Sequence, residues 1–335
     1  MQVKEKIGRG FLYFMDVLEG LKLLPDNSQD LIIVDPPYYK TVNEKWDKQW
    51  ATEQEYLDWC KLWFAECVRV LKDTGSFYCY GNFDILSKQK VLIFDDVLKF
   101  RQNITLSKGL KSIAGRTSDK LRMFPTASEY LVFYINQNYS FQNNDSVNEI
   151  FTPIRQYLKE ELAKSGLKTK DCRKLMSLKV DAGGLRYFSD TSWMMIHKKH
   201  YVALQTNETF TMPYSELAEW YNSLSFTFNL PTGQTDVWDF KPDKVRYGHK
   251  TQKPQDICQR IVKASSNKGD NVLILFAGSG SECEACEVLE RNWTAFENDQ
   301  FSIDIIHERF ENINAFEKSK VGGLFSFTDE PDKAD

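Results

Sequence analysis

The sequence predicts an α/β fold in which a mostly parallel central sheet is interrupted by an irregular insertion. Strand and helix patterns alternate through the first hundred residues, and the alternation resumes after Pro254. The segment between them contains Gly-Gly at 183–184, an aromatic-rich stretch at 185–193 and few helical signals from 222 to 244. We therefore divide the chain into a first half of the core (1–141), an insertion (142–243), a second half of the core (244–315) and a flexible polar tail (316–335).

The first half of the core contains short apolar runs separated by turn residues. Residues 31–34 (Leu-Ile-Ile-Val) are fully apolar, which is typical of a strand buried on both faces of a parallel sheet. A helix is expected at about 52–71, where Thr52 and Glu55 fit a capping box. The remaining strands are expected at 11–15, 76–80, 103–106 and 129–135, and the remaining helices at 16–24 and 86–97.

The insertion opens with two helix-like segments, and regular alternation follows later. Residues 154–163 form an amphipathic pattern that ends near Gly166, and residues 170–178 form a second short helix. In the second half, helices are expected at 257–265, 280–289 and 302–315, and strands at 271–276 and 293–296.

Composition limits the class of protein. Of 335 residues, 42% are hydrophobic and 27% are charged, as in soluble globular proteins. No apolar run is long enough to cross a bilayer, and the first residues lack the apolar core of a signal peptide. We therefore expect a cytoplasmic protein without a membrane partner.

Seven scattered cysteines, an odd number, favour reduced thiols over a disulfide framework. Cys283 and Cys286 form a CxxC pattern, but neither a second CxxC nor a nearby His pair completes a metal site. We interpret the pair as small apolar residues on one face of a helix, and we expect no metal.

Charge is unevenly distributed although the net charge is only −4. Residues 99–124 contain seven Lys or Arg against one acid, and residues 152–203 contain eleven against five. Two basic segments on an otherwise acidic protein are consistent with one side that faces DNA. Solvated faces of ordinary helices explain the charges equally well.

The most informative motif is Asp35-Pro36-Pro37-Tyr38, directly after the apolar strand at 31–34. Parallel sheets place their sites at the carboxyl ends of strands. Prolines lack N–H donors and stiffen the loop, so the Asp35 carboxylate and the Pro36 carbonyl remain as acceptors beside the ring of Tyr38.

Such a set suits methylation of an exocyclic amino group such as N6 of adenine. Two acceptors can hold both N–H bonds and help the nitrogen lone pair to localise, and an aromatic ring can stack on a base that has left the duplex. A strand followed by a structural proline turn is the alternative interpretation.

A second motif, Phe276-Ala277-Gly278-Ser279-Gly280, follows the predicted strand at 271–276. Glycines at such a turn let a ligand approach the backbone. Glu297 follows at the end of the next strand, where an acid can accept hydrogen bonds from ribose hydroxyls. Cys283 stands where a third glycine would complete GxGxxG, so the pattern suits a ligand without phosphate better than a dinucleotide.

The third motif, at residues 249–254 (His-Lys-Thr-Gln-Lys-Pro), lies just before the predicted helix at 257–265. Its polar and cationic groups could reach a carboxylate of the ligand. The alternative is an exposed helix start.

Together the three motifs resemble the beta class of S-adenosylmethionine-dependent DNA amino-methyltransferases, of the kind that occurs in restriction-modification systems. In that class DPPY comes first, a target-recognition region lies in the middle, and TQKP and FxGxG come last. This chain has the same circularly permuted order, at Asp35–Tyr38, Thr251–Pro254 and Phe276–Gly280. The resemblance implies a Rossmann-like methyltransferase fold with an inserted target-recognition region.

The resemblance also assigns roles to residues. Asp35, Pro36, Pro37 and Tyr38 match the catalytic tetrapeptide that holds and stacks the target base. The residues assigned to the cofactor S-adenosyl-L-methionine are Asp16 near its adenine, Thr251 and Lys253 near its carboxylate, Phe276, Gly278 and Gly280 in the cofactor loop, and Glu297 on its ribose. Trp46 matches a residue in a loop that closes over the substrate.

Two positions depart from the family pattern. Ile274 stands where the family often has an acid, and Lys250 replaces a frequent proline. Asp rather than Ser at the head of the tetrapeptide favours adenine N6. The enzyme alternative is methylation of cytosine N4, and the alternative from another class is an inactive DNA-binding regulator on a methyltransferase core.

The insertion is expected to read the DNA sequence. Residues 154–205 resemble a helix-turn-helix arrangement that could bring Arg186, Tyr187 or Ser189 to base edges. A helical wall that only supports the core is the alternative. Expected phosphate contacts or loop contacts to the duplex are Lys108, Lys111, Arg116, Lys120 and Arg122.

The resemblance implies double-stranded DNA as the partner and a nucleoid-associated location in a bacterial or phage context. The resemblance also suggests two further partners, a companion restriction endonuclease and a second copy of this chain in a homodimer.

Overall fold

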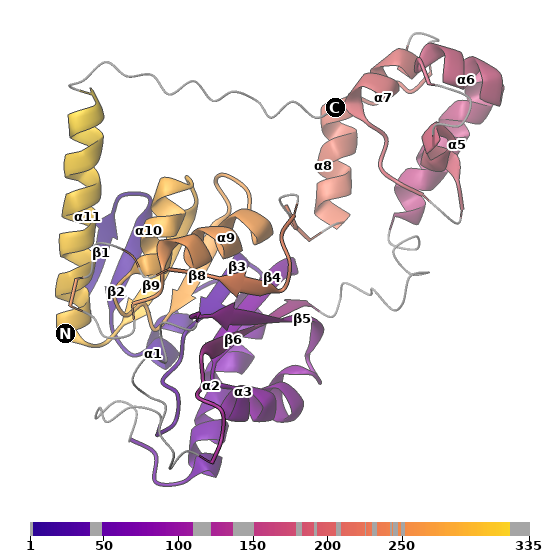
Figure 1. The fold of residues 1–335 in the computed structure, drawn as a ribbon. Helices are drawn as coiled ribbons and strands as arrows, with labels where there is room; N and C mark the ends of the chain where they lie inside the picture. The colour runs from indigo at the N-terminus through magenta and orange to yellow at the C-terminus, as the bar shows by residue number, and fades with distance from the viewer. Residues whose placement is uncertain are drawn as a thin grey trace.

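In the computed structural model, helices cover both faces of a central sheet, and a further group of helices comes from the insertion (Figure 1). The structure describes residues 3–40, 49–109, 122–136, 151–178, 183–190, 193–205, 209–224, 226–229, 233–241, 243, 247–248 and 252–321.

The sheet has nine strands in the order β1-β2-β9-β8-β3-β4-β6-β5-β7. The strands are β1 (Val3–Ile7), β2 (Gly10–Phe14), β3 (Gln29–Val34), β4 (Leu71–Gly81), β5 (Leu98–Ser107), β6 (Ser128–Asn136), β7 (Val237–Asp239), β8 (Asn271–Leu275) and β9 (Asn292–Glu297). The neighbours from β2 through β9, β8 and β3 to β4 run parallel, while β1 and β6 are antiparallel to their neighbours. The expected α/β fold with a mostly parallel sheet is confirmed.

The helices flank this sheet and form the insertion. They are α1 (Val17–Leu21), α2 (Glu53–Val70), α3 (Phe83–Gln89), the π-helix η2 (Lys90–Phe94), α5 (Thr152–Ser165), α6 (Thr169–Leu175), the 3₁₀-helix η4 (Gly183–Phe188), α7 (Lys198–Leu204), α8 (Tyr214–Leu224), α9 (Gln255–Ser265), α10 (Ser281–Val288) and α11 (Gln300–Val321).

Alternation along β3 explains why its sequence is apolar throughout. Leu31 and Ile33 pack into a buried cluster that includes residues of α9, α10 and α11. Ile32 and Val34 point to the other face, into a cluster that includes residues of α1, α2 and α3. The strand is therefore buried on both sides, as its sequence predicted.

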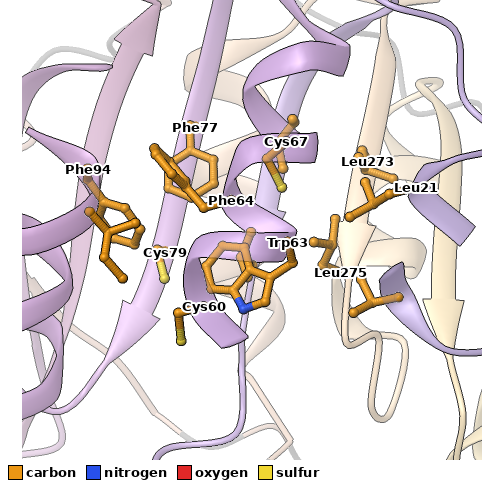
Figure 2. Packing of buried hydrophobic residues seen from close by; sticks show 14 of the residues in the cluster. Leu21, Cys60, Trp63, Phe64, Cys67, Phe77, Cys79, Phe94, Leu273 and Leu275 are labelled. Atoms are coloured by element: carbon orange, nitrogen blue, oxygen red, sulfur yellow. The ribbon is translucent and has the colours of Figure 1, made fainter. Parts of the chain in front are cut away.

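The second of these clusters lies beneath α2. In Figure 2, Trp63 and Cys67 of α2 lie between Phe77 and Cys79 of β4 on one side and strand β8 on the other. Cys67 and Cys79 are fully buried free thiols, as are the other five cysteines. This apolar packing fits the interpretation of the cysteines as core residues.

Several element boundaries differ from the expected ones. Helix α3 begins at Phe83 rather than 86, because the Asn82 side chain caps it by accepting from the Ile85 amide at 3.0 Å. Helix α11 continues to Val321, past the expected start of a loose tail at 316, because no Gly or Pro interrupts it before position 322. Strands β1 and β7 and helices α7 and α8 were not expected from the sequence.

At the start of α2 the expected capping box is only partly formed. The Thr52 hydroxyl accepts from the Glu55 amide at 3.2 Å. The Glu55 carboxylate accepts from the amide of Ala51, not from that of Thr52.

Helices α5 to α8 pack around a core of their own. Figure 1 shows α5, α6 and α7 away from the sheet. Helix α5 ends at Gly166, where φ is +63° and the backbone is left-handed, as expected near that glycine. Strand β7 lies inside the expected insertion yet pairs with β5, so this part of the insertion belongs to the sheet. Within the described residues, no helix combines the length and apolar character needed to span a membrane.

Candidate active site

Four of the predicted site segments meet at one edge of the sheet. Strands β3 and β8 are parallel neighbours in which Val34 pairs with Leu275, so Asp35 and Phe276 both follow at the same edge. Leu275 pairs in turn with Phe296, and Phe14 pairs with Glu297, which places Glu297 and the segment to Asp16 alongside. The carboxyl ends of adjacent parallel strands form this edge.

The tetrapeptide Asp35–Tyr38 is held through its side chains. The Tyr38 hydroxyl donates to Asp35 Oδ1 at 2.7 Å, and Lys253 Nζ lies 2.7 Å from Asp35 Oδ2. Burial, together with the negative charge of Asp35, raises the pKa of Tyr38 well above its usual value, so the hydroxyl remains a donor. The Asp35 side chain is still 24% exposed and retains acceptor capacity, since a carboxylate offers about four lone-pair sites.

Lys253 is a buried cation at the centre of the site. Its Nζ lies 4.0 Å from Glu129 Oε2 and 4.8 Å from the centre of the Tyr80 ring. Burial alone would lower the pKa of Lys253, but the charges of Asp35 and Glu129 outweigh it and raise the pKa overall. We predicted Lys253 near a cofactor carboxylate; the structure pairs it with Asp35, because a buried ammonium needs a carboxylate partner.

Two carboxylates near Lys253 were missed by the sequence analysis. Glu129 is the second residue of β6 and pairs with Lys108, which the sequence predicts to contact phosphate. Glu282, in the first turn of α10, is 5% exposed and accepts from Cys258 Sγ at 3.5 Å. Burial, and next the charge of Asp35, raise the pKa of Glu282. No motif marks either residue, because only the packing of α10 and β6 brings them to Lys253.

The second loop, 276–280, is shaped by its backbone. Phe276, Gly278 and Gly280 all have positive φ, at 59°, 51° and 70°. This conformation is strained for Phe276. Its ring lies 5.5 Å from that of Trp59 and 6.2 Å from that of Trp63, both on α2. Packing against α2 therefore holds the strained residue in place.

Glu297 and Asp16 contribute carboxylates beside this loop. Glu297 Oε2 accepts from the Gly278 amide at 2.7 Å, and Oε1 accepts from the amides of Asn298 and Asp299. Burial raises the pKa of Glu297 despite these hydrogen bonds. The Asp16 side chain is exposed and caps α1 by accepting from the Leu18 amide at 2.8 Å.

A buried arginine fixes the far side of the same loop. Arg309 on α11 is 1% exposed and donates from Nε to the Ser279 carbonyl at 2.7 Å. It also pairs with Glu284 and lies over the ring of Tyr247. No sequence signal marks this role, since α11 begins twenty residues beyond the loop.

Next to the tetrapeptide lies a cavity of about 640 Å³. Tyr39 and Lys40, which follow Asp35–Tyr38, line it, as do Asn82 and Phe83 at the start of α3 and Tyr130 of β6. Because Tyr130 belongs to β6 and Asn82 follows β4, the cavity lies on the side of β3 away from β8 in the strand order.

Not every predicted site residue can be placed. Trp46, Lys111, Arg116, Lys120 and Thr251 lie outside the described residues. Arg122 and Arg186 are described and exposed. Tyr187 does not reach the surface as expected: it is 2% exposed and its hydroxyl lies 2.7 Å from His200 Nδ1, within the core of the insertion.

Packing also explains why position 274 is an isoleucine, where the family often has an acid. Ile274 is 2% exposed and belongs to the apolar cluster beneath α9, α10 and α11. An acid at this position would have to be buried among apolar side chains, which is costly for a charged group.

Several DNA methyltransferases are similar in sequence to most of this chain. The M.HinfI Type II methyltransferase of Haemophilus influenzae is 25% identical over 89% of this chain and 67% of its own length. The M.BamHI Type II methyltransferase of Bacillus amyloliquefaciens is 26% identical over 94% of this chain, which spans only 60% of that relative. The DNA adenine methyltransferase YhdJ of Escherichia coli is 26% identical over 92% of this chain and 88% of its own length.

Solved structures agree on the fold. The PvuII DNA methyltransferase, which is cytosine-N4-specific, has a TM-score of 0.52 at 14% identity, over 93% of this chain and 95% of its own. TTHA0409 of Thermus thermophilus, solved in complex with S-adenosyl-L-methionine, has a TM-score of 0.51 at 15% identity, over 91% of this chain and 94% of its own. The family model described as DNA methylase (N6_N4_Mtase) matches residues 29–308, so this chain belongs to that family of DNA methylases.

Proposed function

We propose that this protein transfers a methyl group from S-adenosyl-L-methionine to N6 of adenine in duplex DNA at a specific sequence. The observation that carries the proposal is the pairing of Val34 with Leu275, which brings Asp35–Tyr38 and the loop 276–280 to one edge. A base and a methyl donor held by these two loops would lie next to each other.

The residues beside the loop 276–280 fit this cofactor. Glu297 and Asp16 offer carboxylate acceptors suited to hydroxyl and amino donors but unsuited to phosphate, and the cofactor has no phosphate. In the left-handed turn at Gly278 and Gly280, the Gly278 backbone is half-buried and can still be approached by a ligand, whereas Gly280 packs against Ile306 of α11. When bound, S-adenosylmethionine would supply an electrophilic methyl group at its sulfonium sulfur.

The catalytic loop would hold the extruded base. The Asp35 carboxylate and the Pro36 carbonyl would each accept a hydrogen bond from one N–H group of the amino group, and the Tyr38 ring would supply a stacking face. Lys253 keeps Asp35 in place through the 2.7 Å ion pair. The cavity beside Tyr39 and Tyr130 offers room for the base outside the duplex.

Adenine N6 is favoured over cytosine N4 by Asp at position 35 and by the name of the relative YhdJ. Cytosine N4 is the second candidate, because the PvuII enzyme of similar fold has that specificity. The Type II relatives support a place in a restriction-modification system with a companion endonuclease, and residues 142–243 would supply sequence recognition. A homodimer and a nucleoid location are further parts of the proposal.

The test is product analysis on unmethylated duplex DNA incubated with the protein and isotope-labelled cofactor. After digestion to nucleosides, mass spectrometry should find labelled N6-methyladenine. Labelled N4-methylcytosine would instead support the second candidate. No labelled base, together with no heat of cofactor binding in calorimetry, would favour an inactive DNA-binding regulator.

A further inference from the structure

A buried tyrosine on α2 contacts the catalytic loop from behind. Tyr56 is fully buried, and its hydroxyl donates to the Pro37 carbonyl at 2.7 Å. Burial raises the pKa of Tyr56 far above its usual value, so the hydroxyl stays protonated. The hydroxyl can therefore act as the donor to the Pro37 carbonyl.

Tyr56 is itself held by a second buried polar residue. Gln89 Nε2 donates to the Tyr56 hydroxyl at 3.2 Å and to Cys60 Sγ at 3.2 Å, and Gln89 is 1% exposed. Gln89 is the last residue of α3, where the helix passes into the π-helix η2. Single-turn π-helical segments of this kind often occur at functional sites.

The Pro37 carbonyl is an important anchoring point of this loop. Proline has no N–H, so the carbonyl is the only backbone group through which Pro37 can be held. Fixing it fixes the peptide plane between Pro37 and Tyr38, and so the backbone from which the Tyr38 side chain projects, while the Tyr38 hydroxyl is held by Asp35. Among the described residues no donor is found on the Pro36 carbonyl.

We propose that Tyr56, supported by Gln89, is a positioning residue that sets the orientation of the catalytic loop. The proposal rests on the proposed function and deepens it. Lys253 and Tyr38 fix the Asp35 end of the loop, and Tyr56 fixes the Pro37 end. Reaction between two held groups is sensitive to displacements of about 1 Å, so loss of one support should slow transfer.

The variant Tyr56→Phe isolates the hydroxyl. The ring of Tyr56 packs at 4.9 Å from Trp50 and 5.6 Å from Tyr39, and phenylalanine keeps this packing. A matched control is Tyr78→Phe: Tyr78 is equally buried, but its hydroxyl bonds the Ser265 hydroxyl at 2.8 Å between β4 and α9. Gln89→Met is a second variant that removes the support and leaves Tyr56 in place.

Three measurements separate positioning from simple stability. Hydrogen exchange of peptides containing Tyr38–Lys40 measures the order of the loop directly. Single-turnover transfer at saturating cofactor and DNA measures the rate of the chemical step. Calorimetry measures the affinity for the cofactor. For Tyr56→Phe we expect exchange at least about threefold faster. We expect transfer about tenfold slower, and a cofactor dissociation constant within about twofold of wild type. Gln89→Met should change in the same direction, and Tyr78→Phe should match the wild type.

The proposal is overturned if Tyr56→Phe leaves either the exchange or the transfer rate unchanged, or if Tyr78→Phe produces the same changes. Failure of the proposed function looks different, because then the wild type itself would transfer no methyl group. In that case the exchange measurement still decides whether Tyr56 orders the loop.

Discussion

The two loops at the edge of the sheet lie on neighbouring strands but are held in different ways. The catalytic loop, Asp35–Tyr38, is fixed by side chains that come from distant segments, Lys253 before α9 and Tyr56 on α2. The loop 276–280 contains left-handed residues, and its own backbone at Gly278 and Ser279 is hydrogen-bonded by the side chains of Glu297 and Arg309. Its first residue, Phe276, is held by ring packing against α2.

This difference separates two tasks. Under the proposed function the loop Asp35–Tyr38 has to present acceptors in a fixed direction, and its two prolines and its charged and aromatic neighbours make it rigid. Under the proposed function the loop 276–280 has to let the cofactor approach the main chain, which the small residues from Ala277 to Gly280 favour. Changes in the first loop should therefore alter the rate of transfer, and changes in the second should alter cofactor affinity.

The largest effect is expected for Asp35→Ala. Loss of the acceptor carboxylate should slow single-turnover transfer by about a thousandfold or more. Calorimetry should show cofactor affinity within about twofold of wild type, since Asp35 belongs to the other loop. Asp35→Asn keeps one acceptor oxygen and should lose less. A variant Asp35→Ala that turned over normally, or that lost the cofactor, would break the division of tasks.

The second-largest effect is expected for Lys253→Met. Removing one partner of a buried ion pair should lower the free energy of unfolding by about 3 kcal/mol and slow transfer by about ten- to a hundredfold. Lys253→Arg should restore part of the rate. If Lys253→Met instead lowered only cofactor affinity, Lys253 would belong with the cofactor loop, as the sequence had predicted.

The pH dependence of this stability difference follows from the raised pKa of Lys253. A raised lysine pKa contributes stability that is complete below the unfolded value of about 10.4 and is lost as pH rises through the folded value. The difference in unfolding free energy between wild type and Lys253→Met should thus stay constant from about pH 6 to pH 10. Denaturant titrations at several pH values check this, and a difference that shrank at neutral pH would contradict it.

Gly280→Ala tests the backbone side of the comparison. A Cβ there would lie 2.8 Å from Ile306 Cγ1, and φ is +70°. Cofactor affinity should fall by about tenfold, with little change in the transfer rate at saturation. Gly166→Ala is the control, because it has φ of +63° but nothing within 4 Å of the added Cβ. Equal losses of affinity in both variants would show that backbone strain anywhere weakens binding.

The smallest effect is expected for Cys286→Ala. Cys286 is fully buried in α10, and burial raises its pKa well above the usual value, so it is neither exposed nor reactive. The transfer rate and the cofactor affinity should stay within about twofold of wild type. A larger loss of the methyl-transfer rate would support a metal or redox role for the CxxC pattern at Cys283 and Cys286.

The residues of both loops were predictable from the sequence, but the residues that hold them were not. Asp35–Tyr38 and Phe276–Gly280 are contiguous motifs after apolar strands, so local patterns were enough. Tyr56, Gln89 and Arg309 act across the fold, and only the packing of α2, α3 and α11 brings them to the loops.

The fold was predictable to a similar degree. Strand β3 was predictable from four consecutive apolar residues because both its faces are buried. Strands β1 and β7 lie at the two ends of the sheet order, where a strand needs no such pattern, and both were missed. Tyr187 was predicted as a reader of base edges because it lies in the helix-turn-helix-like segment 154–205, but tertiary packing buries it.

The most direct test of the shared edge is a crystal structure of the protein with S-adenosyl-L-methionine. The account predicts ribose hydroxyls within hydrogen-bond distance of Glu297 and the methyl group directed toward Asp35. A cofactor bound elsewhere, or bound there with its methyl group directed away from Asp35, would contradict it.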